Sequence, residues 1–221
     1  MRILFVAATE FEVESLVESK KLKVKSKKLG FDSSSLTTPH SLLITGVGMV
    51  ATAYALGREL AKNQYDLAVN LGIAGTFDRN IALGDLVEIT EDTIVELGAE
   101  DDETFLSISQ MGFGKESFAA TYSLTGLTAT ANIKPATAIT VNTVHGNEAS
   151  IQKVQQRLNV QIESMEGAAF FYACNEAGVP CMQIRAVSNY IEKRNREAWQ
   201  IGFAIKNLNK FAVEIVESFE L

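Results

Sequence analysis

The chain has 221 residues and a mass of 24.1 kDa, with 47% hydrophobic residues, and this suffices for one domain with a sizeable core over residues 1–221. Its net charge of −7 and pI of about 5.0 argue against nucleic acid or an anionic membrane as a partner. We expect a cytoplasmic protein, because the N-terminus lacks the charged region of a signal peptide and no apolar run approaches a membrane span. Two cysteines and two histidines leave no credible zinc site, so no metal cofactor is expected.

Short apolar runs in the N-terminal half are typical of buried strands. They predict strands over residues 3–8, 42–45, 67–70 and 86–89, and a helix over residues 50–62. Thr9 is suited to cap a helix that follows the first strand, with Glu12 favoured near the positive end of that helix. The polar, glycine-containing residues 91–134 indicate loops, a hairpin and one short helix.

The C-terminal half continues the alternation of strands and helices. Strands are predicted over residues 136–141, 160–163 and 181–187, and helices over residues 147–158, 165–177 and 197–219. This order predicts an α/β fold with a central mixed, largely parallel sheet and helices on both of its faces.

Two glycine-containing segments follow predicted strands. Gly46-Val-Gly48-Met-Val-Ala51 formally matches a dinucleotide-binding fingerprint. The acidic residue that should end the next strand is missing, because Asp66 precedes that strand and Asn70 ends it. A dinucleotide-binding module therefore stays a minor alternative. We predict Gly72-Ile-Ala-Gly75 to be a small-residue loop at the carboxyl end of its strand.

Polar side chains gather where several predicted elements meet. Glu12 follows the first strand, Glu166 begins an apolar helix, and Ser188-Asn189 ends the last predicted strand. Each residue alone has an ordinary explanation, such as a surface glutamate or a partner of the helix dipole. Together they predict a small-molecule pocket, because α/β folds bind ligands beside strand ends and helix N-termini.

These segments resemble the nucleoside phosphorylase superfamily, in particular its methylthioadenosine/S-adenosylhomocysteine nucleosidase branch and, within it, the futalosine hydrolases of menaquinone biosynthesis. The resemblance covers the whole chain and is weakest over residues 20–40 and 91–134. It implies a homodimer that needs no cofactor and acts on a small-molecule purine nucleoside. It also implies that Glu12 activates water with Arg185 nearby, and that Ala74 and Gly75 line the nucleoside pocket. Ile73 stands where these enzymes carry serine.

The same resemblance assigns the sugar and base contacts. Ser164-Met165-Glu166 corresponds to the family's Glu-Met-Glu motif, in which methionine packs on ribose and glutamate holds its hydroxyls. Val144 and His145 fall in the segment that contacts the base, although we assign His145 no catalytic role. No arginine directly precedes Gly72, which favours water over phosphate as the nucleophile.

Asn189 is the departure that selects the substrate. Adenine-specific nucleosidases carry aspartate at this place, which protonates the purine N7. The asparagine amide can instead donate to a 6-oxo group and accept from a protonated N7, with Ser188 behind it. The prediction is hydrolysis of futalosine to hypoxanthine and dehypoxanthinylfutalosine. Adenine release from methylthioadenosine or S-adenosylhomocysteine, and a non-catalytic nucleotide-binding module, are the alternatives.

The segment after Asn189 is rich in cations. Futalosine carries a benzoate carboxylate on its 5′ extension, and we hypothesise that Arg194 or Arg196 pairs with it. The competing interpretation is a solvated cluster of charges at the start of a helix.

Overall fold

The computed structural model describes residues 1–19, 22–26, 39–124 and 133–219, and a mixed sheet forms its centre. Within this sheet most pairings between the described strands are parallel, and the antiparallel ones are β4–β10, β5–β11 and β5–β8. The predicted largely parallel mixed sheet is thus confirmed. The strands in their spatial order are β10 (Ile162–Ser164), β9 (Lys134–Thr140), β5 (Leu86–Ile94), β11 (Cys181–Tyr190), β4 (Leu67–Thr76), β1 (Ile3–Ala7), β3 (Ser41–Ile44) and β2 (Lys23–Ser26), while β8 (Ser117–Ala119) pairs with β5.

Five strands of this sheet close into a ring. Strand β10 pairs with β9 on one side and with β4 on the other, so that β4, β10, β9, β5 and β11 follow one another around a closed path. Gly75 of β4 lies between two polar residues in this ring, opposite Glu163 on β10 and Asn189 on β11. The ring therefore brings together segments that are more than 80 residues apart in the chain.

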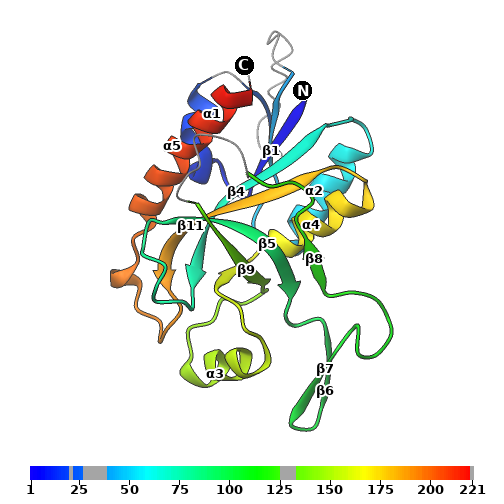
Figure 1. The fold of residues 1–221 in the computed structure, drawn as a ribbon, viewed down its shortest axis with the longest axis vertical. Coiled ribbons are helices and arrows are strands. Elements are labelled where there is room, and N and C mark those ends of the chain that lie inside the picture. The colour runs from blue at the N-terminus through cyan, green and yellow to red at the C-terminus, as the bar shows by residue number, and fades with distance from the viewer. Residues whose placement is uncertain (20–21, 27–38, 125–132, 220–221) are drawn as a thin grey trace.

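Helices cover both faces of the sheet, as predicted (Figure 1). Helices α1 (Glu14–Glu18) and α5 (Ile201–Phe219) pack on one face, and α2 (Met49–Leu60) and α4 (Gly167–Glu176) pack on the other. Helix α3 (Glu148–Arg157) and the hairpin of β6 (Gly98–Asp101) and β7 (Thr104–Ser107) lie at the bottom of the view in Figure 1, at the end of the molecule opposite the marked N- and C-termini. Two short 3-10 helices, η1 (Glu10–Val13) and η3 (Arg196–Ala198), follow β1 and β11.

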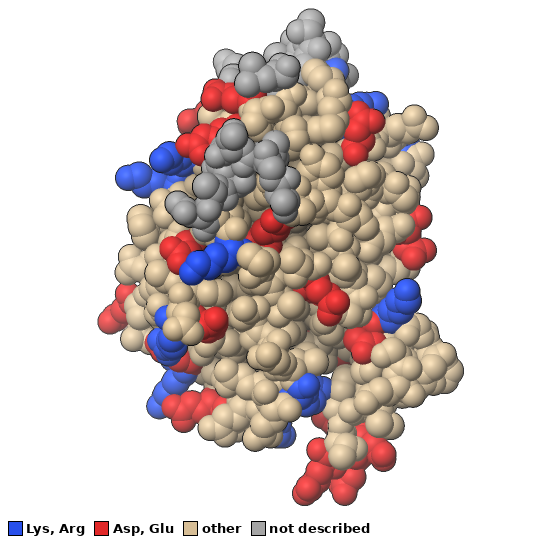
Figure 2. Space-filling view, viewed as in Figure 1, with Lys and Arg blue, Asp and Glu red and all other residues tan. Residues whose placement is uncertain are grey.

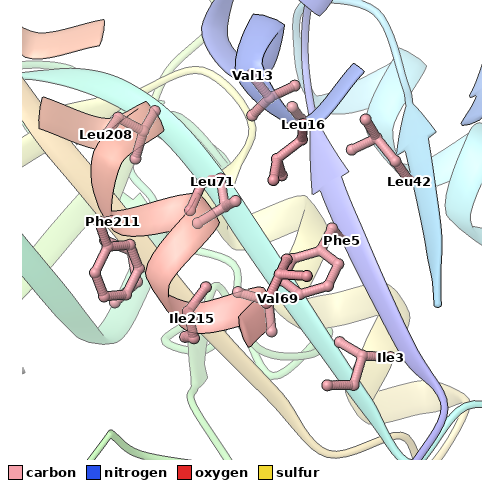
Figure 3. Packing of buried hydrophobic residues seen from close by; sticks show 14 of the residues in the cluster. Ile3, Phe5, Val13, Leu16, Leu42, Val69, Leu71, Leu208, Phe211 and Ile215 are labelled. Carbon is pink, nitrogen blue, oxygen red and sulfur yellow. The ribbon is translucent and has the colours of Figure 1, made fainter. Parts of the chain in front are cut away.

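The alternating sides of β1 supply both layers of the core. Ile3 and Phe5 pack towards α5, while Leu4 and Val6 pack towards α2 and α4, and all four are fully buried. Helix α5 meets the first layer with apolar residues spaced by three or four positions, including Leu208, Phe211 and Ile215 (Figure 3). The apolar runs in the sequence thus determined which segments are buried.

Three strands extend beyond the predicted ends. Strand β4 continues through Thr76, so the prediction of a loop at Gly72–Gly75 is wrong. Strand β11 continues through Tyr190 with a bulge between Val187 and Asn189, and β5 continues to Ile94. Glycine and polar residues remain in strands here because their backbone N–H and C=O groups are hydrogen-bonded to neighbouring strands on both sides. Local strand propensity does not contain this information.

The surface carries charges of both signs. On the face shown in Figure 2, basic and acidic side chains are interspersed, and acidic residues gather at the tip of the β6–β7 hairpin, where residues 100–103 are exposed. This face has no continuous basic patch among its described residues. Within the described ranges, no helix is long and apolar enough to cross a membrane.

Candidate active site

The Glu12 carboxylate accepts three hydrogen bonds, two from Thr9 and one from Ile73 of β4. Its Oε2 accepts from the main-chain N and the Oγ1 of Thr9, each at 3.0 Å, and its Oε1 accepts from the main-chain N of Ile73 at 3.2 Å. The short η1 helix turns the chain back after β1, so that Glu12 points inward and is only 7% exposed. Thr9 caps this turn as predicted, although the turn is a 3-10 helix.

Arg185 lies beside Glu12 because Gly72 has no side chain. A Cβ on Gly72 would lie 2.0 Å from Arg185 Nη1 and 3.1 Å from Glu12 Oε1, so both groups approach the same face of β4. The guanidinium is 1% exposed. Its Nε donates to Gln183 Oε1 at 2.8 Å, and its Nη2 donates to Asn70 and to Gln183. Nη1 has no hydrogen-bond partner among the described residues and faces Gly72 and Glu12.

The surroundings of Glu12 favour proton uptake. Burial raises the pKa of the Glu12 carboxyl, and the nearby Glu166 charge raises it further, whereas Arg185 and the Ile73 N–H lower it. The net direction is upward. A buried carboxylate of raised pKa next to a guanidinium N–H is suited to accept a proton from a water molecule that the guanidinium orients.

Glu166 begins α4, and its side chain reaches across to the loop before α2. Its Oε1 accepts the main-chain N–H of Gly48 at 2.9 Å, and the residue is 7% exposed. Gly48 has a φ of +93°, a backbone conformation that favours glycine. The second glycine of the supposed dinucleotide fingerprint therefore holds a carboxylate of this chain. Met165 lies half-buried between β10 and Glu166.

Ser188 and Asn189 lie at the bulge of β11. Ser188 Oγ lies within hydrogen-bond distance of two acceptors, the carbonyl of Ala74 at 3.1 Å and Asn189 Oδ1 at 2.8 Å, which share its single hydrogen. Asn189 Nδ2 donates to the carbonyl of Tyr190 at 3.2 Å and lies 3.1 Å from where a Cβ of Gly75 would be. These contacts fix the orientation of the half-buried Asn189 amide, and each of its polar atoms keeps capacity for one further hydrogen bond.

The segment after β9 is tied to β10 by a pair that sequence reasoning missed. Glu163 Oε1 accepts the main-chain N–H of His145 at 2.9 Å, and Glu163 Oε2 makes a short hydrogen bond with His145 Nδ1. This carboxylate raises the pKa of His145. Val144 directly precedes His145 and is 37% exposed, so the contacts between His145 and Glu163 anchor it near β10. Neither Val144 nor Met165 makes a side-chain hydrogen bond to the other candidate residues.

Three further buried polar residues escaped the sequence prediction. Asn70, Gln183 and Asp92 surround Arg185 or extend its hydrogen bonds. The spacing of Gln183 and Arg185 gave a signal, since residues two apart share one face of a strand. Asp92 gave none, because it falls where loops were expected. Among the described residues, no group of three or more His, Cys, Asp or Glu side chains could hold a metal ion.

Comparison with known proteins places this site in a family. The family model described as "Phosphorylase superfamily" matches residues 2–219. A futalosine hydrolase of Streptomyces coelicolor is 36% identical over 174 residues, which cover 76% of this chain and 74% of that protein.

Two solved structures share the fold at low sequence identity. A 5′-methylthioadenosine/S-adenosylhomocysteine nucleosidase from Helicobacter pylori superposes with a TM-score of 0.82 at 15% identity, covering 100% of this chain and 99% of that one. A futalosine hydrolase of the same species gives a TM-score of 0.79 at 14% identity, covering 100% and 98%. With a family match over nearly its whole length and a relative of this similarity, the chain belongs to the phosphorylase superfamily.

Proposed function

We propose that this chain is a nucleosidase that hydrolyses the N-glycosidic bond of futalosine and releases hypoxanthine and dehypoxanthinylfutalosine. The observation that carries the proposal is the meeting of Glu12 and Arg185 beside Gly72, with Asn189 on the same strand as Arg185. The similarity to the Streptomyces futalosine hydrolase supports the substrate.

The water-activating step is assigned to Glu12. A water molecule that accepts from Arg185 Nη1 and donates to Glu12 Oε1 would lose its proton to this carboxylate as its oxygen bonds to C1′ of the ribose. The bond between C1′ and N9 breaks at the same stage, and its electron pair leaves with the purine. Because the pKa of Glu12 is raised, the carboxylate is a stronger base than an exposed glutamate would be.

The sugar is assigned to Glu166 and Met165. Positive charge develops on ribose as the glycosidic bond breaks, and a carboxylate near the sugar hydroxyls stabilises it. Glu166 is buried and lies close enough to Glu12 to raise its pKa, so the two carboxylates share one small region. Ala74 and Gly75 would line the path between the sugar and the base.

The base is assigned to Asn189 with Ser188. Asn189 Nδ2 has one hydrogen left to donate to the 6-oxo group of hypoxanthine, and Oδ1 can accept from a purine N7 protonated from solvent. Val144 would contact the ring from the segment that Glu163 anchors. A 6-amino group would place a donor opposite the Asn189 NH2, and such a mismatch typically costs ~1–3 kcal/mol.

Release of adenine from methylthioadenosine or S-adenosylhomocysteine is the runner-up. The discriminating assay incubates the protein with futalosine, inosine and methylthioadenosine and identifies the released base by chromatography. Hypoxanthine from futalosine is expected. Adenine release without hypoxanthine release would refute the substrate assignment, and no base from any substrate would favour a non-catalytic binding module.

A single substitution sharpens this test. In N189D, a carboxylate oxygen would replace the NH2 that donates to the carbonyl of Tyr190, so two acceptors would face each other. We expect futalosine hydrolysis to fall by at least ~10-fold, with a gain for 6-amino substrates. The matched control is N147D, because the exposed Asn147 caps α3 through Oδ1 and aspartate caps equally well. Unchanged selectivity in N189D would remove Asn189 from base recognition.

We also propose a homodimer. The N-terminal part of α2 and the residues before it expose a patch of Val47, Val50 and Tyr54, which are 57%, 82% and 56% exposed. The patch adjoins Gly48, which holds Glu166, so a second copy seated on it would border the sugar side of the site. Sedimentation should give a dimer for the wild type and a monomer for V50D. The control F113D changes an exposed apolar residue outside this patch, and loss of the dimer there as well would contradict the assignment.

A further inference from the structure

A fully buried carboxylate on β5 has no part in the reaction described above. Asp92 is 0% exposed and accepts two hydrogen bonds from neighbouring strands. Thr140 Oγ1 of β9 donates to its Oδ1 at 2.7 Å, and Gln183 Nε2 of β11 donates to its Oδ2 at 3.1 Å. A buried charge is costly unless it is paired, so its partners are informative.

The direction of each hydrogen bond in this network is fixed by chemistry. Arginine can only donate, so Gln183 must present Oε1 to Arg185 and its NH2 to Asp92. On the other side, Thr140 Oγ1 accepts the main-chain N–H of Ala168 at 2.8 Å, and its own hydrogen is donated to the Asp92 carboxylate. Both Asp92 oxygens face donors, and this arrangement favours the ionised carboxylate.

The network leaves the Arg185 guanidinium one free direction. Nε and Nη2 are engaged by Gln183 and Asn70, and Nη1 faces Gly72 and Glu12. Helix α4 closes the opposite side, because a Cβ on Gly167 would lie 2.0 Å from Asp92 Oδ2 and 2.3 Å from Gln183 Oε1. The Asp92–Gln183–Arg185 relay is therefore packed from both ends.

The charges around Asp92 are few. The pKa of Asp92 is raised to about 6, mainly by burial and to a smaller extent by the charge of Glu166 at the start of α4. The hydrogen bonds from Thr140 and Gln183 and the positive charge of Arg185 oppose this rise. Strand β8, which pairs with β5 beside Asp92, places the apolar Phe118 opposite it. Asp92 is thus ionised above about pH 6 and protonated below it.

We propose that Asp92 is a positioning residue for water activation, which acts through the Gln183 amide to hold Arg185 with Nη1 directed at Glu12. The relay rests on the proposed function, since Glu12 and Arg185 are its endpoints. Protonation of Asp92 weakens the acceptor that orients Gln183 and removes the counter-charge of Arg185. The positive charge of Arg185 is then less neutralised, which lowers the pKa of Glu12 and makes it a weaker base.

The experiment compares D92N with the transposed double variant D92N/Q183E. In D92N the introduced amide can accept from Thr140, but its NH2 then faces the NH2 of Gln183. In the double variant the carboxylate introduced at position 183 accepts from Arg185 and from the introduced amide at position 92, so every donor meets an acceptor. The control is D101N, the same chemical change at the exposed hairpin tip.

We expect kcat of D92N at pH 7 to fall ~10–100-fold with KM within about threefold, because a misdirected group near the reaction costs about this much. The acid limb of its kcat profile should move to lower pH. The double variant should recover most of kcat, and D101N should match the wild type. A folded D92N with wild-type kcat and acid limb, or a folded double variant as slow as D92N, would overturn the proposal.

A measurement on the wild type separates this relay from the proposed function. The ¹H–¹⁵N signal of the Arg185 Nε–H, which donates to Gln183, should shift with pH around 6 as Asp92 titrates, even if no substrate is cleaved. A signal that stays constant from pH 5 to 7.5 would overturn the relay whatever the activity. A shifting signal in a protein that cleaves no nucleoside would support the relay and refute the function.

Discussion

The substitution G72A tests how the site is built. The Arg185 guanidinium and the Glu12 carboxylate meet over Gly72 of β4. A methyl group there would lie 2.0 Å from Arg185 Nη1, which would have to retreat by about 1.4 Å to reach the 3.4 Å of ordinary van der Waals contact. Arg185 has little freedom to do so, because it is 1% exposed and bonded to Asn70 and Gln183.

The expected effect on G72A follows from this displacement. A shift of about 1 Å in a catalytic group costs ~100-fold in rate, equivalent to about 3 kcal/mol of barrier. Insertion of one methyl group into a packed interior lowers the free energy of unfolding by about 1–3 kcal/mol. Steady-state release of hypoxanthine and urea unfolding measure the two quantities separately.

The matched control is G57A. Gly57 is exposed in the middle of α2, and a Cβ there meets no atom within 4 Å. Alanine should stabilise this helix by about 0.5–1 kcal/mol without changing the rate. If G72A kept wild-type kcat and stability, the crowding of Glu12 and Arg185 over Gly72 would be refuted.

Three further predictions concern charges. Because the pKa of Glu12 is raised, kcat/KM should rise with pH through a value above the ordinary range of glutamate, and E12Q should lose ~10²–10⁴-fold at all pH values; an active E12Q would exclude this base. Burial raises the pKa of Asp92 from 3.8 to about 6, so the contribution of Asp92 to the free energy of unfolding falls as pH rises through this window. From pH 4 to pH 7, the free energy of unfolding of D92N, measured in urea, should therefore rise by about 2–3 kcal/mol relative to that of the wild type. A difference that stays constant would contradict the raised pKa. The guanidinium carbons of Arg194 and Arg196 lie 5.0 and 6.0 Å from the Trp199 ring centre. R194A or R196A should raise KM for futalosine about tenfold, but not KM for inosine, which lacks the benzoate carboxylate. Unchanged KM values for futalosine in both variants would rule out the contact with this carboxylate.

Much of the fold followed from local sequence patterns. The apolar runs at residues 3–8, 42–45 and 136–141 became strands because their side chains are buried on both faces of the sheet. The amphipathic helices were predicted from the spacing of the apolar residues that each helix buries. Asn147 caps α3, as a side chain of its type should. The ends of β4 and β11 were missed, because glycine, serine and asparagine weaken a strand signal that two neighbouring strands restore.

The residues of the candidate site also fall into two groups, those that the local sequence indicated and those whose partners are distant in the chain. Glu12, Glu166 and Asn189 stood out because each polar residue directly follows or begins an element that the sequence already defined. Glu163 was visible but had no assignable partner, since His145 lies 18 positions earlier in a loop. Asp92 gave no signal of its own, because the contact that gives it meaning is with Gln183, 91 positions away.

By itself, the sequence determined which segments are buried, the α/β class, and the residue types available for glycosidic chemistry, because these depend on hydrophobic periodicity and on the functional groups of single side chains. Only the tertiary structure decided how those groups are coupled. The antiparallel register of β5 against β11 brings Asp92, Gln183 and Arg185 into one relay, and the bare backbone at Gly72 lets this relay end at Glu12. Contact between distant residues arises from strand pairing and close packing, which no local pattern encodes.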